Sequence, residues 1–382
     1  MLPASTSGRI CIGIDASRSI SAQPTGTELY SRYLIEALLS RAPDQLSFHL
    51  YFNQAPDSAL SAQHSALSSQ RLTTRIIPFP RLWTHARLSA EMLLHRPDLL
   101  FVPAHVLPLV HPRRSVVTVH DLGYLYFPEA HPPRQRWYLD RSTRWHTHTA
   151  AHLLADSAAT KRDLIEKYHA APARIAVAYP GLDPSVRRVE DPAEIARVKA
   201  RYDVNGDYLF YLGTIQPRKN LQRLIAAFLQ LPNARFQLLL AGKRGWYADQ
   251  LLQQAGDRVR FIGYVDAADK NALLSGATAF VFPSLYEGFG FPVLEAMACG
   301  VPVLCSSTSS LPEVAGEAAL LMNPLEVDDI ARGLQDITTN EDLRRTLIER
   351  GYQQTQKFTW QACAEVVLDV FENLLKPDKM KG

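Results

Sequence analysis

The chain of 382 residues contains no hydrophobic run that approaches the length of a membrane span. Its four cysteines, Cys11, Cys299, Cys305 and Cys363, are scattered and show no paired metal spacing, which favours a reducing cytosol over a disulfide framework. The first residues, MLPASTSG, lack the apolar core of a signal peptide and lead directly into a strand-like RICIGID. We therefore expect a cytoplasmic globular protein.

Several catalytic motifs are also missing. No Asp-x-Asp triplet occurs, which disfavours a metal clamp on a diphosphate. A Walker phosphate loop, a His/Cys metal cluster and a G-x-S-x-G nucleophile turn are all absent. The G-x-G-x-x-G fingerprint of dinucleotide enzymes does not follow the first predicted strand. These absences weigh against ATPase and dehydrogenase classes, and we expect neither a metal nor another cofactor.

Charge is distributed unevenly along the chain. The net charge of +3 divides into +6 for residues 1–180 and −3 for the remainder, and all 12 histidines fall in the first half. One half could therefore face an anionic partner, although a solvated surface without function explains the excess equally well. We expect no nucleic-acid partner.

Short apolar strands alternate with helical patterns in both halves, which predicts parallel βαβ units. Strands are expected in the first half at Arg9–Asp15, Phe48–Phe52, Thr74–Ile77, Leu99–Val102, Val116–His120, AHLLADS and Arg174–Pro180. In the second half they are expected at Tyr208–Leu212, Phe236–Ala241, Val259–Ile262, Ala279–Phe282, Val301–Cys305 and Ala319–Met322.

The polar segment 184–207 separates the halves, and we place the domain boundary at its start. We predict an α/β protein of two Rossmann-like doubly wound domains that face a central cleft, where ligands of such sheets bind. Residues 1–183 form the first domain and residues 184–359 the second. The final helix, about 360–382, is expected to pack back on the first domain.

The stretch SLYEGFGFPVLEAMACG (Ser284–Gly300) is the most informative motif. Strand, glycine turn and helix follow one another here, an arrangement that aims backbone N–H groups at a phosphate. Glu287 and Glu295 flank the turn, and their carboxylates can accept bidentate hydrogen bonds from sugar or ribose diols. Alternatively, the glycines are ordinary turn residues and Glu295 interacts with the helix dipole.

A second strand-to-helix junction, YLGTIQPRKN (Tyr211–Asn220), carries adjacent cations at Arg218 and Lys219. Gly213 allows close backbone approach. A guanidinium beside an ammonium suits a diphosphate, and still better the charge that grows as a nucleoside diphosphate leaves. The alternative is a solvated pair, but cations are unfavourable at a helix start, which favours an anionic ligand.

Three shorter patterns are less specific. LLLAGKRGW places Gly242 and Lys243 after another strand, where they could line the same site. TVHDLGY places His120 at the end of a strand, where it could donate to a sugar hydroxyl or serve a structural role, with Asp121 capping or orienting it. PTGTELY offers Gly26 as a phosphate contact or as part of a plain N-cap.

Residues 131–152 interleave four arginines with Trp137, Tyr138 and Trp145 in a helical pattern. Such a face can contact an anionic membrane or a lipid-diphosphate acceptor. The alternative is a solvated helix whose aromatic side chains are buried.

Together these motifs resemble the family 4 retaining glycosyltransferases of GT-B fold. The resemblance is strongest from Tyr208 to Pro324, through YLGTIQPRKN, LLLAGKRGW, VRFIGYV, FPSLYEGFGFPVLEAMACG and SSLPEVAG in the family's order. The first domain is similar more loosely, through PTGTELY, TVHDL, ADSAATKRDL and YPGLD. The family often has two glycines in the loop after the first strand, whereas only Gly26 stands there.

The resemblance implies a role for each motif residue. Glu287 matches the glutamate that contacts the donor sugar, and Glu295 the one that contacts the nucleotide ribose. Arg218 and Lys219 match the pair that holds the donor diphosphate, and His120 a histidine near the transferred sugar. The expected donor site is completed by Gly26, Gly213, Gly242, Lys243, Tyr264, Val265, Gly288, Phe289, Gly290 and Phe291.

The resemblance also implies a metal-independent hexosyltransferase that moves mannose from GDP-mannose to a saccharide or lipid-linked saccharide. A UDP-glucose donor is the nearest alternative. A nucleotide-sugar epimerase of the same fold and a non-catalytic nucleotide-sugar binding protein remain open. We expect the enzyme in the cytoplasm, with peripheral contact through 131–152 on the inner face of the membrane.

Overall fold

The computed structural model describes residues 9–20, 26–56, 71–79, 81–104, 106–232, 235–243, 251 and 256–376. The chain divides into two compact units. The first comprises Met1–Leu122, Pro133–Gly181 and Phe358–Gly382, and the second comprises Gly123–Pro132 and Leu182–Lys357. The sequence placed the boundaries at 183/184 and 359/360, and it assigned the segment Gly123–Pro132 to the first domain.

The first unit contains a fully parallel sheet of seven strands in the order β3-β2-β1-β4-β5-β6-β7. The strands are β1 (Ile10–Asp15), β2 (Leu46–Phe52), β3 (Leu72–Ile76), β4 (Leu99–Val102), β5 (Ser115–Val119), β6 (His152–Ala155) and β7 (Ile175–Val177). Its helices are α1 (Gly26–Arg41), η1 (Thr84–Leu88), α3 (Ser89–Leu94), α5 (Pro133–Thr149), α6 (Ala158–Tyr168), η3 (Pro172–Arg174) and α15 (Trp360–Leu375).

The second unit contains a parallel sheet of six strands in the order β10-β9-β8-β11-β12-β13. The strands are β8 (Asp207–Leu212), β9 (Phe236–Ala241), β10 (Val259–Gly263), β11 (Ala279–Phe282), β12 (Val303–Ser306) and β13 (Ala319–Met322). The helices are α4 (Gly123–Tyr126), η2 (Pro128–Ala130), α7 (Pro192–Arg201), η4 (Pro217–Lys219), α8 (Leu221–Leu229), α10 (Ala267–Ser275), α11 (Phe291–Ala298), α12 (Leu311–Ala315), α13 (Val327–Thr339) and α14 (Glu341–Thr355).

Both sheets have the doubly wound order. The first strands of each unit are added on one side of its first strand, and the later strands are then added on the other side. The central strands explain why the sheets are parallel and covered on both faces. β4, β5, β11 and β12 are buried along their whole length and are rich in Val, Leu and Phe, as strands packed on both sides must be. The predicted architecture of two Rossmann-like domains is confirmed.

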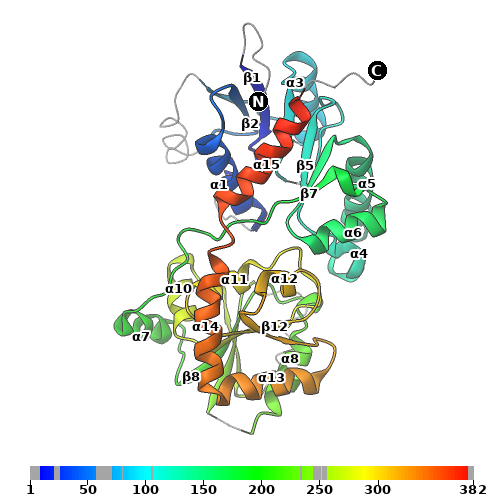
Figure 1. Ribbon diagram of the computed structural model, residues 1–382. Helices are drawn as coiled ribbons and strands as arrows, with labels where there is room; N and C mark the ends of the chain where they lie inside the picture. Colours follow the sequence, from blue (N-terminus) through cyan, green and yellow to red (C-terminus); the bar gives the residue numbers. More distant parts are fainter. Residues whose placement is uncertain are drawn as a thin grey trace. The chain divides into compact units, whose positions relative to one another are not determined.

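The last helix, α15, belongs to the first unit, although it begins about 180 residues after the end of β7. Thr359 caps it by accepting a hydrogen bond from the Ala362 N–H, so the helix begins at Trp360. Trp360 packs edge-on against Tyr30 of α1, and Phe371 packs against Phe101 of β4, with ring centroids 5.7 and 5.5 Å apart. Figure 1 shows α15 (red) lying along α1 (blue).

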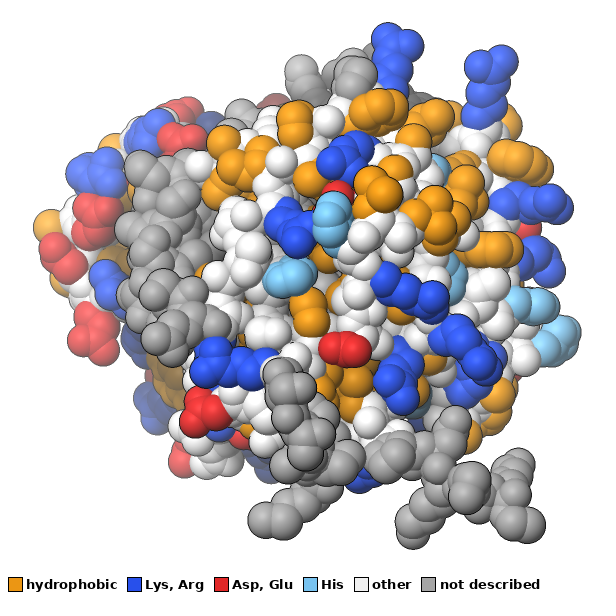
Figure 2. All heavy atoms as spheres, turned by 90° about the horizontal axis from the view of Figure 1, so that it is seen from above, with side chains coloured by type: hydrophobic (Ala, Val, Ile, Leu, Met, Phe, Trp, Pro, Cys, Tyr) orange, Lys and Arg blue, Asp and Glu red, His pale blue; other side chains and the backbone are white. Residues whose placement is uncertain are grey.

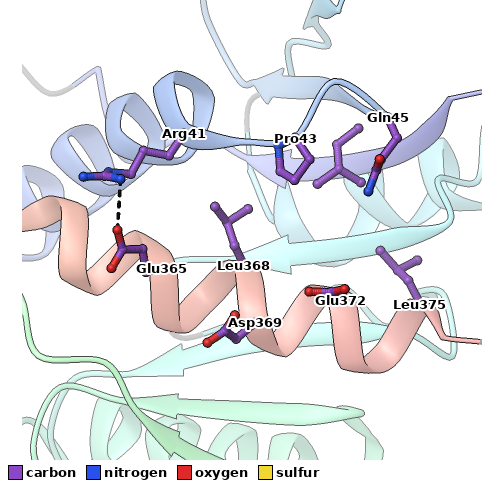
Figure 3. A pocket seen from close by; sticks show the side chains of 9 residues that line it. Arg41, Pro43, Gln45, Glu365, Leu368, Asp369, Glu372 and Leu375 are labelled. Carbon is purple, nitrogen blue, oxygen red and sulfur yellow. Dashed lines mark ion pairs between the residues drawn. The ribbon is translucent and has the colours of Figure 1, made fainter. Parts of the chain in front are cut away.

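A shallow groove runs between α15 and the segment that follows α1. Figure 3 shows its side chains, with Arg41 bridging to Glu365 at 2.9 Å, and Glu365, Asp369 and Glu372 projecting from α15. Because Arg41 and Glu365 are both half exposed, this ion pair contributes little to stability. The apolar contacts of Trp360 and Phe371 therefore hold the helix in place.

The switch from one direction of strand order to the other occurs between β8 and β11 in the second unit. Ligands of doubly wound sheets bind outside the carboxyl ends of the strands at such a point. The backbones approach very closely beside it. Gly242, with φ of +140°, lies so near Gly213 that a Cβ at position 242 would stand 2.0 Å from the Gly213 carbonyl oxygen.

Gly242→Ala is expected to destabilise the second unit markedly, because it adds a backbone clash to an unfavourable φ. Strain and overpacking of about 1–3 kcal/mol each predict a loss of several degrees in Tm. Gly206→Ala is the matched control, since Gly206 also has a positive φ of +73° but has no atom within 4 Å of the added Cβ. If the two variants had the same Tm, the close packing of Gly242 against Gly213 would be contradicted.

Candidate active site

A buried cluster of charged side chains lies at the carboxyl ends of β8 and β11, at the switch point of the second sheet. Glu287 Oε2 accepts a hydrogen bond from Arg218 Nη1 at 3.0 Å, and Glu287 Oε1 accepts one from Lys219 Nζ. Lys219 and Glu287 are both buried. We call these three residues the charged triad. The structure therefore brings together three of the four residues that the sequence proposed as catalytic.

Local backbone geometry explains why these side chains meet. Pro217–Lys219 forms one short helical turn after β8, and Asn220 then takes a left-handed conformation with φ of +59° before α8 begins. The Asn220 amide nitrogen donates to the carbonyl oxygens of Pro283 and Pro324, at 3.2 and 2.6 Å. Asn220 thereby ties the turn after β8 to the loops after β11 and β13. Sequence reasoning missed this role, although the RKN triplet contains the residue.

The loop that carries Glu287 is held on its other side by Ser309 and Ser310, which precede α12. The Glu287 N–H donates to Ser309 Oγ at 3.0 Å, and the Glu287 carbonyl accepts from Ser310 Oγ at 2.9 Å. Ser310 Oγ also donates to the Phe289 carbonyl. The repeated serines of CSSTSS are the signal in the sequence that could have indicated this support.

A further contact comes from α4. The ring of Tyr126 stacks on that of Tyr286, with centroids 4.8 Å apart and planes at 25°. Arg218 Nη1 also donates to the Tyr286 carbonyl at 2.9 Å. Tyr286, the residue before Glu287, is thus held at its ring by Tyr126 and at its carbonyl by Arg218.

The electrostatics of the triad keep Glu287 ionised. Burial opposes the charged carboxylate, but Lys219 and Arg218 outweigh that cost and lower the pKa of Glu287 to about 2. Lys219 Nζ also lies 4.9 Å from the centre of the Phe282 ring, a favourable cation–π distance. Two cations facing one carboxylate leave the cluster with a net charge of +1. This excess suits a further anion.

Glu295 belongs to a separate ion pair. It lies on α11, where its Oε1 accepts from Lys270 Nζ of α10 at 2.7 Å. Burial raises the pKa of Glu295, and Lys270 opposes that shift. Lys270 was not singled out from the sequence, because no motif marks a lone lysine on a neighbouring helix.

The glycine loop after β11 has the conformation that its sequence requires. Gly290 precedes α11 with φ of +129°, and a Cβ there would lie 2.8 Å from Leu311. Phe289 and Phe291 on either side pack edge to face, with centroids 5.1 Å apart. Gly288 and Phe289 lie in the loop itself, and Phe291 is the first residue of α11.

The remaining donor-site candidates of the second unit line the same edge of its sheet. Gly213 and Gly242 follow β8 and β9, and Gly263 ends β10. The Gly213 N–H donates to the Ala241 carbonyl at 2.9 Å, and the Gly242 N–H donates to the Gly263 carbonyl at 2.8 Å. The Lys243 carbonyl accepts from Ile215 N–H at 3.2 Å. Tyr264 is exposed and Val265 is buried.

His120 and Gly26 lie in the first unit. His120 follows β5 and makes two hydrogen bonds, from Nδ1 to Asp156 Oδ2 at 2.7 Å and from Nε2 to the Pro103 carbonyl at 2.9 Å. The Pro103 carbonyl can only accept, so Nε2 carries a hydrogen, and the proton between Nδ1 and Asp156 is shared by the pair. Burial disfavours the charged ring, but Asp156 outweighs it and raises the pKa of His120.

Asp156, after β6, is a hydrogen-bond partner of His120, and the adjacent Asp121 acts on its pKa in the same direction. The sequence held a signal, because AHLLADS ends the next strand of the sheet and its aspartate lies at the same edge. Both His120 nitrogens are engaged, so donation to a sugar hydroxyl would require one of these bonds to break. Gly26 is the exposed first residue of α1, and residues 21–25 lie outside the described ranges.

The basic segment 131–152 contains α5. Trp137, Tyr138 and Trp145 are exposed on it rather than buried, and the Arg141 guanidinium lies 5.7 Å from the centre of the Trp137 ring. Arg144 pairs with Asp140 at 3.1 Å. None of the helices in the described ranges combines the length and apolar character that a bilayer crossing requires. Within the same ranges, no group of three His, Cys, Asp or Glu side chains could hold a metal ion.

Two family models match the chain. Residues 24–186 match the model described as Glycosyltransferase Family 4, and residues 193–354 match the model described as Glycosyl transferases group 1. The O-antigen chain mannosyltransferase B of Escherichia coli is 33% identical over 94% of this chain and 99% of its own length. The serotype-specific mannosyltransferase WbdA of E. coli is 31% identical over 69% of this chain, which spans only 34% of that longer protein.

Solved structures share the fold. The sucrose-phosphate synthase of Thermosynechococcus elongatus has a TM-score of 0.72 at 21% identity, covering 96% of this chain and 99% of its own. HepE of Anabaena, solved with UDP and glucose, has a TM-score of 0.70 at 19% identity, covering 96% and 100%. WaaG, a glycosyltransferase of lipopolysaccharide biosynthesis, has a TM-score of 0.68 at 16% identity, covering 94% and 99%.

The pKa of Glu287 predicts a pH dependence of stability. The pKa of Glu287 is about 2 in the folded protein and 4.5 in the unfolded chain. The ionised Glu287 therefore stabilises the fold fully above pH 4.5, and this contribution is lost as the pH falls from 4.5 toward 2. Glu287→Gln should lose about 3 kcal/mol of unfolding free energy at neutral pH, and its deficit relative to wild type should shrink below pH 4.5.

The control is Glu341→Gln, which removes an exposed glutamate paired with exposed Arg345 and should change stability by less than about 1 kcal/mol. Thermal melts between pH 3 and 7 measure all three proteins. A deficit of E287Q that stays constant with pH would show that Glu287 is not held ionised by the cations.

Proposed function

The chain belongs to glycosyltransferase family 4 and is a glycosyltransferase, and from this premise we propose that it transfers mannose from GDP-mannose to a saccharide or lipid-linked saccharide. We further propose that the anomeric configuration is retained and that no metal takes part. The observation that supports a transfer reaction best is the charged triad at the switch point of the second sheet. The choice of mannose rests on the two E. coli mannosyltransferases to which the chain is similar.

In this proposal the second unit holds the donor. Arg218 and Lys219 bind the diphosphate, and they stabilise the negative charge that grows on it as the bond to the sugar breaks. The net charge of +1 on the triad favours an incoming anion before any side chain moves. A forked guanidinium can bridge two phosphate oxygens while the ammonium acts as a compact charge beside it.

We propose that Glu287 acts on the sugar. Its depressed pKa keeps it an anion at neutral pH, so it can accept hydrogen bonds from sugar hydroxyls and stabilise positive charge on the oxocarbenium-like ring. We assign it no covalent bond to the sugar. Glu295 is proposed to bind the ribose, and it must then share its carboxylate between Lys270 and the diol.

The remaining donor contacts are proposed along the same edge. The loop of Gly288, Phe289, Gly290 and Phe291 presents backbone N–H groups to the phosphates, and Tyr264 and Val265 contact the base. Gly213, Gly242 and Lys243 allow the donor to approach the ends of β8 and β9. The first unit is proposed to bind the acceptor, with His120 and Gly26 near the reacting groups.

Lys219→Ala is expected to reduce kcat about 10²- to 10³-fold, because it removes a preorganised cation from the leaving diphosphate. Lys199→Ala, on α7 of the same unit, is the matched control, since Lys199 Nζ donates to the Gly206 carbonyl and lies 5.5 Å from the centre of the Tyr208 ring, and neither partner belongs to the triad. Steady-state kinetics with GDP-mannose, with and without EDTA, measure both effects. Equal rates for the two variants would show that Lys219 does not act on the donor. Loss of wild-type activity in EDTA would refute the metal-independent mechanism.

The donor and the stereochemistry are tested together. Among GDP-mannose, UDP-glucose and an ADP sugar, GDP-mannose should raise Tm most, by mass action on the folded state. NMR of the product should then show an α linkage, as in the donor. If UDP-glucose alone raised Tm, the donor would be UDP-glucose rather than GDP-mannose. A β linkage in the product would refute retention. An epimerised sugar formed without an acceptor would favour an epimerase, and donor binding without turnover a binding protein.

A further inference from the structure

The two glutamates that flank the glycine turn after β11 have different electrostatic surroundings. Glu287 faces two cations, Lys219 and Arg218, and its pKa is lowered to about 2. Glu295 faces one cation, Lys270 of α10, and burial raises its pKa above the ordinary value. The negative charge of Glu287 is therefore secured by two partners, whereas that of Glu295 depends on a single lysine.

The contact between Lys270 and Glu295 is short and mostly buried. Lys270 Nζ donates to Glu295 Oε1 at 2.7 Å, and the two side chains are 20% and 12% exposed. Figure 2 shows many Lys and Arg side chains on the face seen from above, where water screens their charge. Lys270 differs from such exposed cations, because a mostly buried charge is costly unless a counter-ion is held against it.

The ion pair uses only one oxygen of the carboxylate. No residue that the structure describes donates a hydrogen bond to Glu295 Oε2, and part of the side chain remains exposed. An ionised carboxylate has about four acceptor sites on its two oxygens, so Lys270 leaves Oε2 and a second lone pair of Oε1 for a ligand. A pair of vicinal hydroxyls fits a carboxylate that is occupied in this way.

The position of the pair in the second unit makes a ribose the matching diol. Phe291 begins α11, and Glu295 lies four residues further, about 6 Å along the helix axis. The loop before α11 is proposed to bind the phosphates, and in a nucleoside diphosphate the ribose is the next group. Lys270 comes from α10, which closely follows the proposed base contacts Tyr264 and Val265. Both partners of the ion pair thus belong to the nucleoside end of the proposed donor site.

Two further titratable groups interact with Glu295. Burial is the largest cause that raises the pKa of Glu295, and the like charge of Asp183, after β7, adds to it. Burial also raises the pKa of the Cys299 thiol to about 12, so this group stays neutral near pH 7. Of these neighbours, Lys270 is therefore the one that favours the ionised carboxylate.

We propose that Lys270 is a positioning residue for the donor: it holds Glu295 as an anion with Oε2 open to the ribose diol, and so makes the second unit select ribonucleotides over 2′-deoxyribonucleotides. The proposal rests on the proposed function in one point, the assignment of Glu295 to the ribose. Without Lys270 the carboxyl group would take up a proton at higher pH. It would then lose the charge-assisted hydrogen bonds to the diol.

The test is calorimetric binding of GDP, 2′-deoxy-GDP, UDP and 2′-deoxy-UDP to the whole protein between pH 5 and 9. Wild type should bind a ribonucleotide about tenfold more tightly than its deoxy form, as expected for one hydrogen bond to a charged group. In Lys270→Met this preference should appear only at higher pH, because Glu295 ionises later. The ratio of the two affinities cancels the titration of the diphosphate, which both probes share.

Three further variants separate this role from a purely structural one. Lys270→Arg keeps the cation and should restore the wild-type preference. Glu295→Gln should abolish the preference at every pH, and K270M/E295Q should bind as E295Q does, because the two residues act as one unit. Lys199→Met is the matched control, since it removes a lysine of the same unit whose Nζ donates to the Gly206 carbonyl. Circular dichroism melts check that each variant is folded.

A K270M variant that keeps the wild-type preference at every pH would overturn the proposal, even with a lower Tm, because Lys270 would then only stabilise the fold. A loss that is independent of pH and that K270R does not restore would overturn it as well. A ribose preference that depends on Lys270, without sugar transfer from GDP-mannose, would refute the proposed function alone. Transfer without that dependence would refute the role of Lys270 alone, and failure of all four nucleotides to bind would refute both.

Discussion

The arrangement of the second unit depends on the pairing of Glu287 with Arg218 and Lys219. Lys219 and Glu287 are buried, and taking a charge out of water costs several kcal/mol per ion, which only close mutual contacts and hydrogen bonds offset. The surrounding structure supplies those contacts. Asn220 fixes the turn that carries the cations, and Ser309 and Ser310 fix the loop that carries the carboxylate. Because both cations bond to the one carboxylate, the loops after β8 and β11 are held to each other at this point.

The fold followed from local patterns because those patterns are strong. Buried parallel strands such as β11 and β12 are continuous apolar runs, and glycine or proline turns separate them from helices, so strand positions and the two-domain plan could be predicted. The Gly123–Pro132 segment was different. It is too short to show periodicity, and Tyr126 stacks on Tyr286, 160 residues away, a contact that only the folded chain reveals.

The candidate site was predictable to the extent that its residues stand in motifs. Arg218, Lys219 and Glu287 follow two strands that are neighbours in the sheet, so their meeting could be expected once the strand order was assumed. Lys270, Asp156 and the serines before α12 could not be found in this way, because each acts from a different element. The hydrogen bonds of His120 were equally hidden, since its partners, Asp156 and the Pro103 carbonyl, come from separate loops.

The triad also bears on how a donor could be accommodated. Glu287 accepts hydrogen bonds from both cations, so under the proposed function it competes with the donor diphosphate for Arg218 and Lys219. An incoming diphosphate carries more charge than one carboxylate and can draw Arg218 and Lys219 toward itself. Glu287 would then retain its negative charge while losing part of its compensation. That is the condition in which a carboxylate interacts most strongly with a positively charged sugar ring, because nearby cations no longer neutralise it. Under the proposed function, the charged groups that hold the loops together thus act on the two products of bond breaking. Arg218 and Lys219 interact with the leaving diphosphate, and Glu287 interacts with the sugar ring.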